Sequence, residues 1–455
     1  MFLSALPHTN IFLPQAHEAL FVYQIAYTDR VEYPSELHAS HSNAGRDRYT
    51  QLGICQRLCN PPATEPLFSN LRYLYVDQSS ASEIKIKYWL YMPLPSLISL
   101  RVDFMGENQD ILQGPLASFS KFSPNLKGLT FYLRQHDITF SNFFSTYICQ
   151  WQDLHTVDCS RIALDPEALA HLSRMPALTR LSFTPSAGLP LPDSPLFFSN
   201  LHCLTLFSES LNSISRLLSR TRLPAITAFI VFLRGHRSKY RFPSFLASIQ
   251  TSAIGHTIQD LQFKEGSLGS DEEDTEDATP VLGFEDLQPL MAFSKLRRME
   301  FSVLWEVVLS DSDLLTLASA WPHLEQLVIN ARWGWNTLGG ITPNGLLQLL
   351  QTCQSLTEVA IAIDTRGYTE FRESSTILGL TLPPTFSINV IDSLIDEESV
   401  PAITAFFVGL GVSCPNFSFC AYDSFQLLRL ADHTADGTHW CDICEQVNHA
   451  LKQHA

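Results

Sequence analysis

Charged side chains are scarce in this sequence: Asp, Glu, Lys and Arg make up only 17% of its 455 residues. An ordinary globular chain carries about a quarter. Hydrophobic residues reach 45%, which excludes a disordered chain and allows a large buried core. Thirty Lys and Arg against 46 Asp and Glu leave a net charge of −16, and such a field repels phosphate backbones and anionic lipid. We therefore expect neither nucleic acid nor a membrane as the partner.

Long apolar runs are also missing. The two longest, residues 223–233 and 400–412, fall short of the roughly 20 residues that a membrane-spanning helix needs. Residues 1–15 have neither the basic start nor the apolar centre of a secretion signal. The 10 cysteines are scattered, whereas secreted disulfide scaffolds are short and dense in cysteine. These absences favour a cytoplasmic or nuclear protein with reduced thiols.

Motifs of the common enzyme classes are absent as well. The sequence has no phosphate-binding P-loop, no complete Gly-x-Gly-x-x-Gly after a strand and no nucleophile elbow. His17-Glu18 lacks the second histidine four residues on that a zinc-protease helix requires. We predict that the protein is not an enzyme and uses no cofactor. An enzyme without a recognisable motif is the remote alternative.

One short motif, Cys441-Asp442-Ile443-Cys444, could bind a metal. No second Cys-x-x-Cys pair follows it, and its spacing fits no standard zinc finger. We therefore interpret residues 431–455 as a C-terminal capping helix with the two cysteines as small buried residues, and predict no metal site. A zinc site remains the alternative, because three histidines lie nearby: His433, His439 and His449.

A three-point phrase, apolar-x-x-apolar-x-apolar, recurs along most of the chain. Ser69–Val76 and Pro322–Ile329 are two clear copies. Successive copies are about 29 residues apart, at the upper end of the leucine-rich-repeat range. The first apolar positions, which we call anchors, are Leu71, Leu97, Leu126, Leu154, Leu178, Leu201, Ile226, Ile258, Leu296, Leu324, Leu356, Ile388 and Phe417.

Each phrase has the pattern of a strand, and the spacers have the pattern of helices. The last two apolar positions are two residues apart, as in a strand with one buried face. Asp165 followed by Pro166 is a good helix start, and residues 311–321 and 343–353 carry leucines at helical spacing. The sequence thus predicts an α/β leucine-rich-repeat solenoid, a horseshoe of about 13 strand-helix units over residues 66–430. An ordinary α/β sheet protein would not keep this spacing so often.

The repeat phrases resemble those of fungal F-box/leucine-rich-repeat proteins, especially the mushroom families. The resemblance runs from about residue 67 to the end, and it implies a recognition solenoid joined to an N-terminal F-box that docks on the adaptor of a cullin-RING ubiquitin ligase. We assign residues 1–65 as a degenerate or missing F-box region, since Leu6-Pro7 is present without a clear F-box helix after it. The repeats also lack the Asn that usually follows the strand. The resemblance rests on the Pro/Ser-Asn-Leu phrases, Trp321-Pro322-His323-Leu324, Cys353-Gln354-Ser355-Leu356, Pro415-Asn416-Phe417 and Trp440.

The longest interval between anchors contains a dense acidic run, residues 269–277. Such a composition cannot bury apolar surface, so we predict a solvated loop insertion over residues 266–282. The alternative is a docking or phosphorylation segment, because Ser270 is followed by three acidic residues.

Strand alternation also predicts where a partner binds. Residues two and four positions after each anchor point away from the core, which places them on the concave face. Tyr and Arg carry interface energy more often than other residues. Trp333 and Trp335 follow a predicted strand, and they either pack over the solenoid edge or anchor a partner there. The candidate partner-binding residues are Tyr73, Tyr75, Arg101, Arg180, Arg298, Glu300, Trp333 and Trp335.

From these patterns we predict a protein that recognises another protein through its leucine-rich-repeat surface. The finer prediction is a substrate receptor of a cullin-RING ubiquitin ligase, with the ligase adaptor as a second partner. The alternative is a free-standing scaffold with no ligase link.

Overall fold

The computed structural model forms two compact units, Met1–Leu201 (unit 1) and His202–Ala455 (unit 2), and each is treated by itself. Trp333, the acidic run and most of residues 1–65 lie outside the described residues. The structure describes residues 19–22, 70–78, 93–104, 112–133, 138–185, 194–234, 242–252, 257–266, 281–303, 305–332, 334–335, 340–369, 380, 382–412, 414–421 and 434–454.

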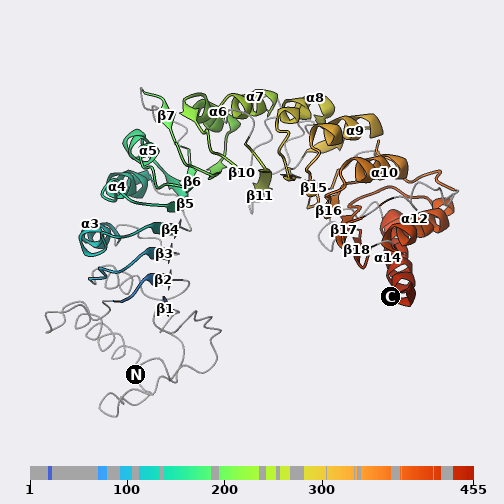
Figure 1. Ribbon diagram of the computed structural model, residues 1–455, viewed down its shortest axis with the longest axis horizontal. Helices are drawn as coiled ribbons and strands as arrows, with labels where there is room; N and C mark the ends of the chain where they lie inside the picture. The colour runs from blue at the N-terminus through green and yellow to red at the C-terminus, as the bar shows by residue number, and fades with distance from the viewer. Residues whose placement is uncertain are drawn as a thin grey trace, which may run out of the picture. The chain divides into compact units, whose positions relative to one another are not determined.

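Unit 1 is a parallel sheet whose strands pair in chain order (Figure 1). Its helices connect successive strands and lie on one side of them, and no helix of the described residues covers the other side, which we call open (Figure 1). Asp165 begins α5 as expected, since its carboxylate accepts a hydrogen bond from the backbone N–H of Ala168. The strands are β1 (Ala19–Val22), β2 (Tyr73–Gln78), β3 (Ser99–Phe104), β4 (Gly128–Leu133), β5 (Thr156–Ala163) and β6 (Arg180–Thr184). The helices are α3 (Gln113–Phe122), α4 (Ile138–Ile148) and α5 (Pro166–Ser173).

Unit 2 continues the same alternation, with its helices again on one side of the strands (Figure 1). The strands that pair in chain order are β8 (Cys203–Ser208), β10 (Ala228–Arg234), β11 (Asp260–Gly266), β13 (Arg298–Ser302), β15 (Gln326–Ile329), β16 (Glu358–Ala360), β17 (Thr385–Asn389) and β18 (Asn416–Cys420). The helices are α6 (Leu211–Ser219), α7 (Phe242–Ser252), α8 (Phe284–Leu287), η4 (Gln288–Ala292), α9 (Asp311–Ala320), α10 (Pro343–Thr352), η5 (Glu397–Ser399), α12 (Val400–Val412) and α14 (Thr434–His454). A separate pair is formed by β12 (Val281–Gly283) and β14 (Glu306–Val308).

The predicted α/β leucine-rich-repeat architecture is confirmed in both units. Anchors from Leu97 to Leu356 are at most 1% exposed, because they lie between the sheet and the helices. Strand neighbours pair position for position: Leu100 lies opposite Leu129, and Met299 opposite Leu327. The repeat spacing therefore predicts the register as well as the strands.

The last two anchors are wrong. Ile388 pairs with Val359 and with Phe419, so Ile388 and Phe419 occupy the second apolar position rather than the first. Phe417 pairs with Phe386, and each of them lies two residues before the second apolar position of its strand. The sequence pattern misled us because a strand alternates every two residues, and an apolar-x-x-apolar match in the following turn can shift the assigned register.

The expectation that the repeats lack an asparagine after the strand is wrong for one repeat of unit 2. Asn330 directly follows β15, has a φ of 54° and is completely buried. Its side-chain oxygen accepts a hydrogen bond from the N–H of Val303 at 2.9 Å, and its amide donates to the carbonyl of Trp305 at 2.8 Å. Asn330 thereby satisfies two buried backbone groups of the preceding repeat, which would otherwise cost free energy.

Two predicted boundaries differ from the structure, whereas α14 (Thr434–His454) lies within the predicted capping-helix range of residues 431–455. The repeat sheet begins inside residues 1–65, because β1 pairs in parallel with β2. The acidic insertion ends earlier than 282, since Val281 and Leu282 belong to β12 and Leu282 is completely buried. The C-terminal helix α14 buries Trp440 and its neighbours against α12 and β18, with the Trp440 ring 6.2 Å from that of Phe407.

Candidate functional site

The candidate site lies on the open face of unit 1, which we define as the strand side chains that point away from the helices. Alternation along each strand produces this face: in β3, Leu100, Val102 and Phe104 are completely buried, whereas Arg101 is exposed. Tyr73 on β2 is 44% exposed. Large side chains that the core excludes are therefore presented to solvent along neighbouring strands.

Arg101 is the centre of this face, and it lies between two tyrosine rings. Its guanidinium carbon is 4.9 Å from the ring centre of Tyr75 and 4.9 Å from that of Tyr132. Tyr75 pairs with Arg101 across β2 and β3, and Tyr132 comes from β4 on the other side. Both contacts are within the range of attractive cation–π interactions. We call these three residues the tyrosine–arginine stack.

Two carboxylates hold the stack in place. Asp103 accepts hydrogen bonds from Nε and Nη2 of Arg101, both at 3.1 Å, and from the hydroxyl of Tyr75 at 2.6 Å. Asp158 accepts from the hydroxyl of Tyr132 at 2.9 Å and from that of Ser160 at 2.5 Å. Each polar end of the stack is thus fixed, while half of the Arg101 side chain stays exposed.

The same contacts shift two pKa values. The hydrogen bond to Asp103 raises the pKa of Arg101, so this side chain remains charged at any physiological pH. Burial raises the pKa of Tyr132 to about 12, and the negative charge of Asp158 adds to this effect. Tyr132 therefore stays a neutral hydrogen-bond donor to Asp158.

Sequence reasoning found only part of this cluster. Tyr73, Tyr75 and Arg101 were predicted and do share one face, and Arg180 is exposed on β6 of the same unit. Tyr132 was missed because we stopped four residues after each anchor, although Tyr132 lies six residues after Leu126. The β4 strand is six residues long, so extending the same alternation by two residues would have identified Tyr132.

Arg298 and Glu300, the two predicted strand residues of unit 2, belong to a polar network on the open face of that unit. Arg298 forms an ion pair with Asp260 at 3.3 Å and a hydrogen bond to Gln326. Glu300 forms an ion pair with Lys264 at 2.9 Å. These side chains satisfy one another, and solvent-exposed pairs of this kind contribute little free energy.

Trp335 is not a partner anchor. It is completely buried, and its indole N–H donates to the carbonyl of Ile329 at 2.8 Å. Its backbone N–H donates to the Asp392 carboxylate at 2.8 and 2.9 Å. The ring therefore has no surface left for a partner. Trp335 packs inside the repeats, which is the other interpretation that the sequence allowed.

Both cysteines of α14 were expected to be buried, and this expectation is wrong for Cys441. Cys441 is exposed, and only Cys444 is partly buried. Burial raises the pKa of Cys444 to about 12, so its thiol is protonated at neutral pH. Within the described residues, no group of three or more His, Cys, Asp or Glu side chains has an arrangement that could hold a metal ion.

None of the helices in the described ranges is both long and apolar enough to span a bilayer.

No known protein family and no curated protein matches this chain. Among solved structures, the chain is similar to the leucine-rich-repeat-containing protein LegL7 from Legionella pneumophila. That match has 12% sequence identity and a TM-score of 0.30, and it covers 84% of this chain and 98% of LegL7.

Proposed function

We propose that this protein recognises another protein through the open face of unit 1, with the tyrosine–arginine stack at the centre of the interface. The observation that carries the proposal is the position of Arg101, which is half exposed yet held by two rings and a bidentate carboxylate. A side chain that is already ordered loses little conformational entropy when a partner binds. Tyr and Arg in such arrangements contribute a large share of interface energy.

The free donors of Arg101 indicate the chemistry of the contact. Asp103 uses Nε and Nη2, whereas a guanidinium carries five N–H donors. The remaining donors point to an acceptor on the partner, such as a carboxylate or a backbone carbonyl. The neighbouring Tyr73 ring offers apolar surface beside them. A partner loop that combines an acidic residue with an apolar one fits this surface.

A site-specific photo-crosslinker tests the proposed face. We expect a crosslinker at position 73 to capture a partner in cells, and one at position 142, an exposed residue of α4, to capture none. Arg180→Ala and Tyr75→Ala should each reduce the captured partner by at least about tenfold. Arg180→Ala should lower the free energy of unfolding by no more than about 1 kcal/mol, whereas Tyr75→Ala also loses the hydrogen bond to Asp103 and should cost about 1–3 kcal/mol.

Lys121→Ala, on the exposed surface of α3, is the matched control and should keep full capture. Equal capture from positions 73 and 142, or full capture by both open-face variants, would show that recognition does not use this face.

The finer proposal is that the captured protein is the substrate of a cullin-RING ubiquitin ligase, which would place this chain in the cytoplasm or nucleus. Its support is the sequence resemblance, and Leu6-Pro7 lies outside the described residues. Removing all of residues 1–65 would also remove β1, so a point variant is the sharper tool. The ligase adaptor should bind the full chain and not a Leu6→Ala, Pro7→Ala double variant. No binding to either chain would favour the free-standing scaffold.

A further inference from the structure

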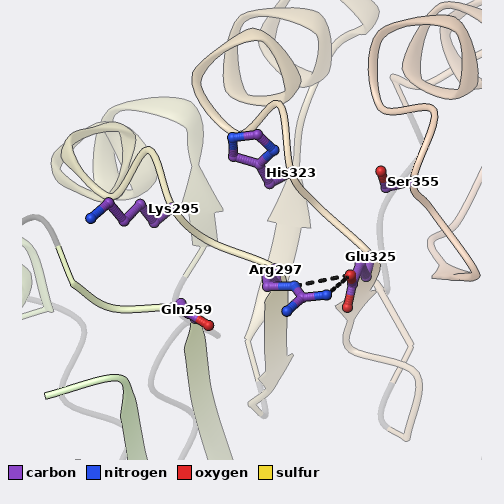
Figure 2. A pocket seen from close by; sticks show the side chains of 6 residues that line it. All are labelled: Gln259, Lys295, Arg297, His323, Glu325 and Ser355. Atoms are coloured by element: carbon purple, nitrogen blue, oxygen red, sulfur yellow. Dashed lines mark hydrogen bonds and ion pairs between the residues drawn. The ribbon is translucent and has the colours of Figure 1, made fainter.

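Unit 2 has an open hollow along the edge of the sheet where the strands begin (Figure 2). Its volume is about 490 Å³, within the range of small-molecule sites. Four successive repeats contribute to it, through the segments that lead into β11, β13, β15 and β16. The lining residues are Gln259, Lys295, Arg297, His323, Glu325 and Ser355.

The repeat geometry explains why side chains, and not backbone groups, line this hollow. The carbonyl of Gln259 accepts from the N–H groups of Arg297 and Arg298, both at 2.8 Å. The carbonyl of Arg297 accepts from Glu325 at 2.7 Å and from Gln326 at 2.9 Å. This ladder uses the backbone at the edge, so the side chains beside each anchor project from it (Figure 2).

The side chains around the hollow are mainly hydrogen-bond donors. Arg297 forms an ion pair with Glu325, and its Nε donates to Oε1 of Glu325 at 2.9 Å, which fixes the guanidinium. Lys295 makes no ion pair within the part of the chain that the structure describes. His323 and Ser355 add further polar groups. The hollow is therefore locally cationic in a chain whose net charge is −16.

We propose that this hollow binds a phosphate monoester. The hollow offers a pre-oriented arginine, a flexible lysine two residues before it and neutral donors on the neighbouring repeats, and a tetrahedral dianion beside Arg297 can accept from the donors next to it. A carboxylate ligand would have to compete with the Glu325 carboxylate, which already binds one side of the Arg297 guanidinium. The site is in a different unit from the tyrosine–arginine stack, so this inference does not depend on the proposed function.

Calorimetric titration of the full chain tests the inference. The probes are a phosphoserine peptide, the same peptide without phosphate, and glucose 6-phosphate. We expect saturable binding of at least one phosphorylated probe, no binding of the unphosphorylated peptide, and weakening as salt is raised. Lys295→Gln and Arg297→Gln should each weaken binding by at least about tenfold, the usual loss for one charge-assisted hydrogen bond.

Lys127→Gln is the matched control, because Lys127 follows its anchor Leu126 as Arg297 follows Leu296 but lies in unit 1. It should bind like the original chain. A preference for the phosphopeptide would identify a modified protein as the ligand, and a preference for glucose 6-phosphate a metabolite. If Arg297→Gln lowers the melting temperature, its loss of binding could reflect unfolding, and the affinity of Lys295→Gln for the phosphorylated probes is then the test. No binding up to about 10 mM, or equal loss in Lys127→Gln, would overturn the inference.

Discussion

Arg101 shows how a single charged residue can be made rigid on a solvent-facing strand. Its guanidinium lies between the rings of Tyr75 and Tyr132, and two hydrogen bonds to Asp103 fix its orientation. An exposed arginine without these contacts would sample many rotamers and lose that freedom on binding. The three strands that supply these residues are consecutive, so the repeat itself assembles the stack.

The pKa of Tyr132 provides a test at the residue scale. Its folded-state pKa is raised to about 12, so the neutral form contributes stability that is complete below the ordinary value near 10 and is lost as the pH rises through about 12. Asp158→Asn should lower the pKa of Tyr132, although burial will keep it above 10. Tyrosinate absorbance against pH measures the shift.

Tyr132→Phe identifies the Tyr132 component of that titration curve, since it removes this phenol and leaves the ring. An unchanged curve in Asp158→Asn would mean that the Tyr132–Asp158 contact is absent in solution.

Helices α9 and α10 are joined by one carboxylate. Asp311, the first residue of α9, accepts hydrogen bonds from the backbone N–H and the hydroxyl of Thr342, both at 2.7 Å. Thr342 in turn caps α10. A Cβ at Gly345 of α10 would overlap the Asp311 carboxylate, so the glycine permits the close approach. Neighbouring repeats are thus locked through their helices as well as through the sheet.

Gly345→Ala tests this contact between the two elements. Alanine favours a helix over glycine by about 1 kcal/mol. We nevertheless expect a loss of about 1–3 kcal/mol in the free energy of unfolding, because the added methyl must displace a hydrogen-bonded carboxylate. Denaturant titration of Gly345→Ala, Asp311→Ala and the double variant measures the coupling. The double variant should lose less than the sum of the single losses, and strict additivity would contradict the contact.

Each unit of the molecule is a series of repeats in which each repeat packs mainly on its neighbours. Leu181 in unit 1 and Leu327 in unit 2 occupy equivalent positions, and each is 1% exposed. In such proteins, the stability of a region is set by local packing and nearest-neighbour contacts. A cavity in one compact unit should therefore destabilise that unit more than the other.

Leu181→Ala and Leu327→Ala should each cost about 2–5 kcal/mol, the usual range for a buried leucine. Hydrogen exchange read peptide by peptide should show the largest loss of protection in residues 93–201 for Leu181→Ala and in residues 257–421 for Leu327→Ala. Uniform loss of protection along the entire chain in both variants would indicate a single cooperative core instead.

The sequence by itself determined the repeat, the strands and most of their register. Apolar side chains recur at fixed offsets, and burying them between a sheet and its helices leaves one consistent arrangement over most of the chain. The same alternation placed Tyr73, Tyr75 and Arg101 on one face. It failed at Ile388 and Phe417, where a period of two residues fits more than one register.

Only the tertiary structure decided which polar residues act together. The Tyr75–Arg101–Tyr132 stack joins three strands, and its fixed orientation depends on Asp103 and Asp158. Burial of Trp335 and the backbone role of Asn330 likewise depend on contacts with other repeats. Periodicity specifies which face a side chain is on, but distances between side chains on neighbouring strands depend on twist, rotamer and hydrogen bonding, which arise only when the repeats are packed together.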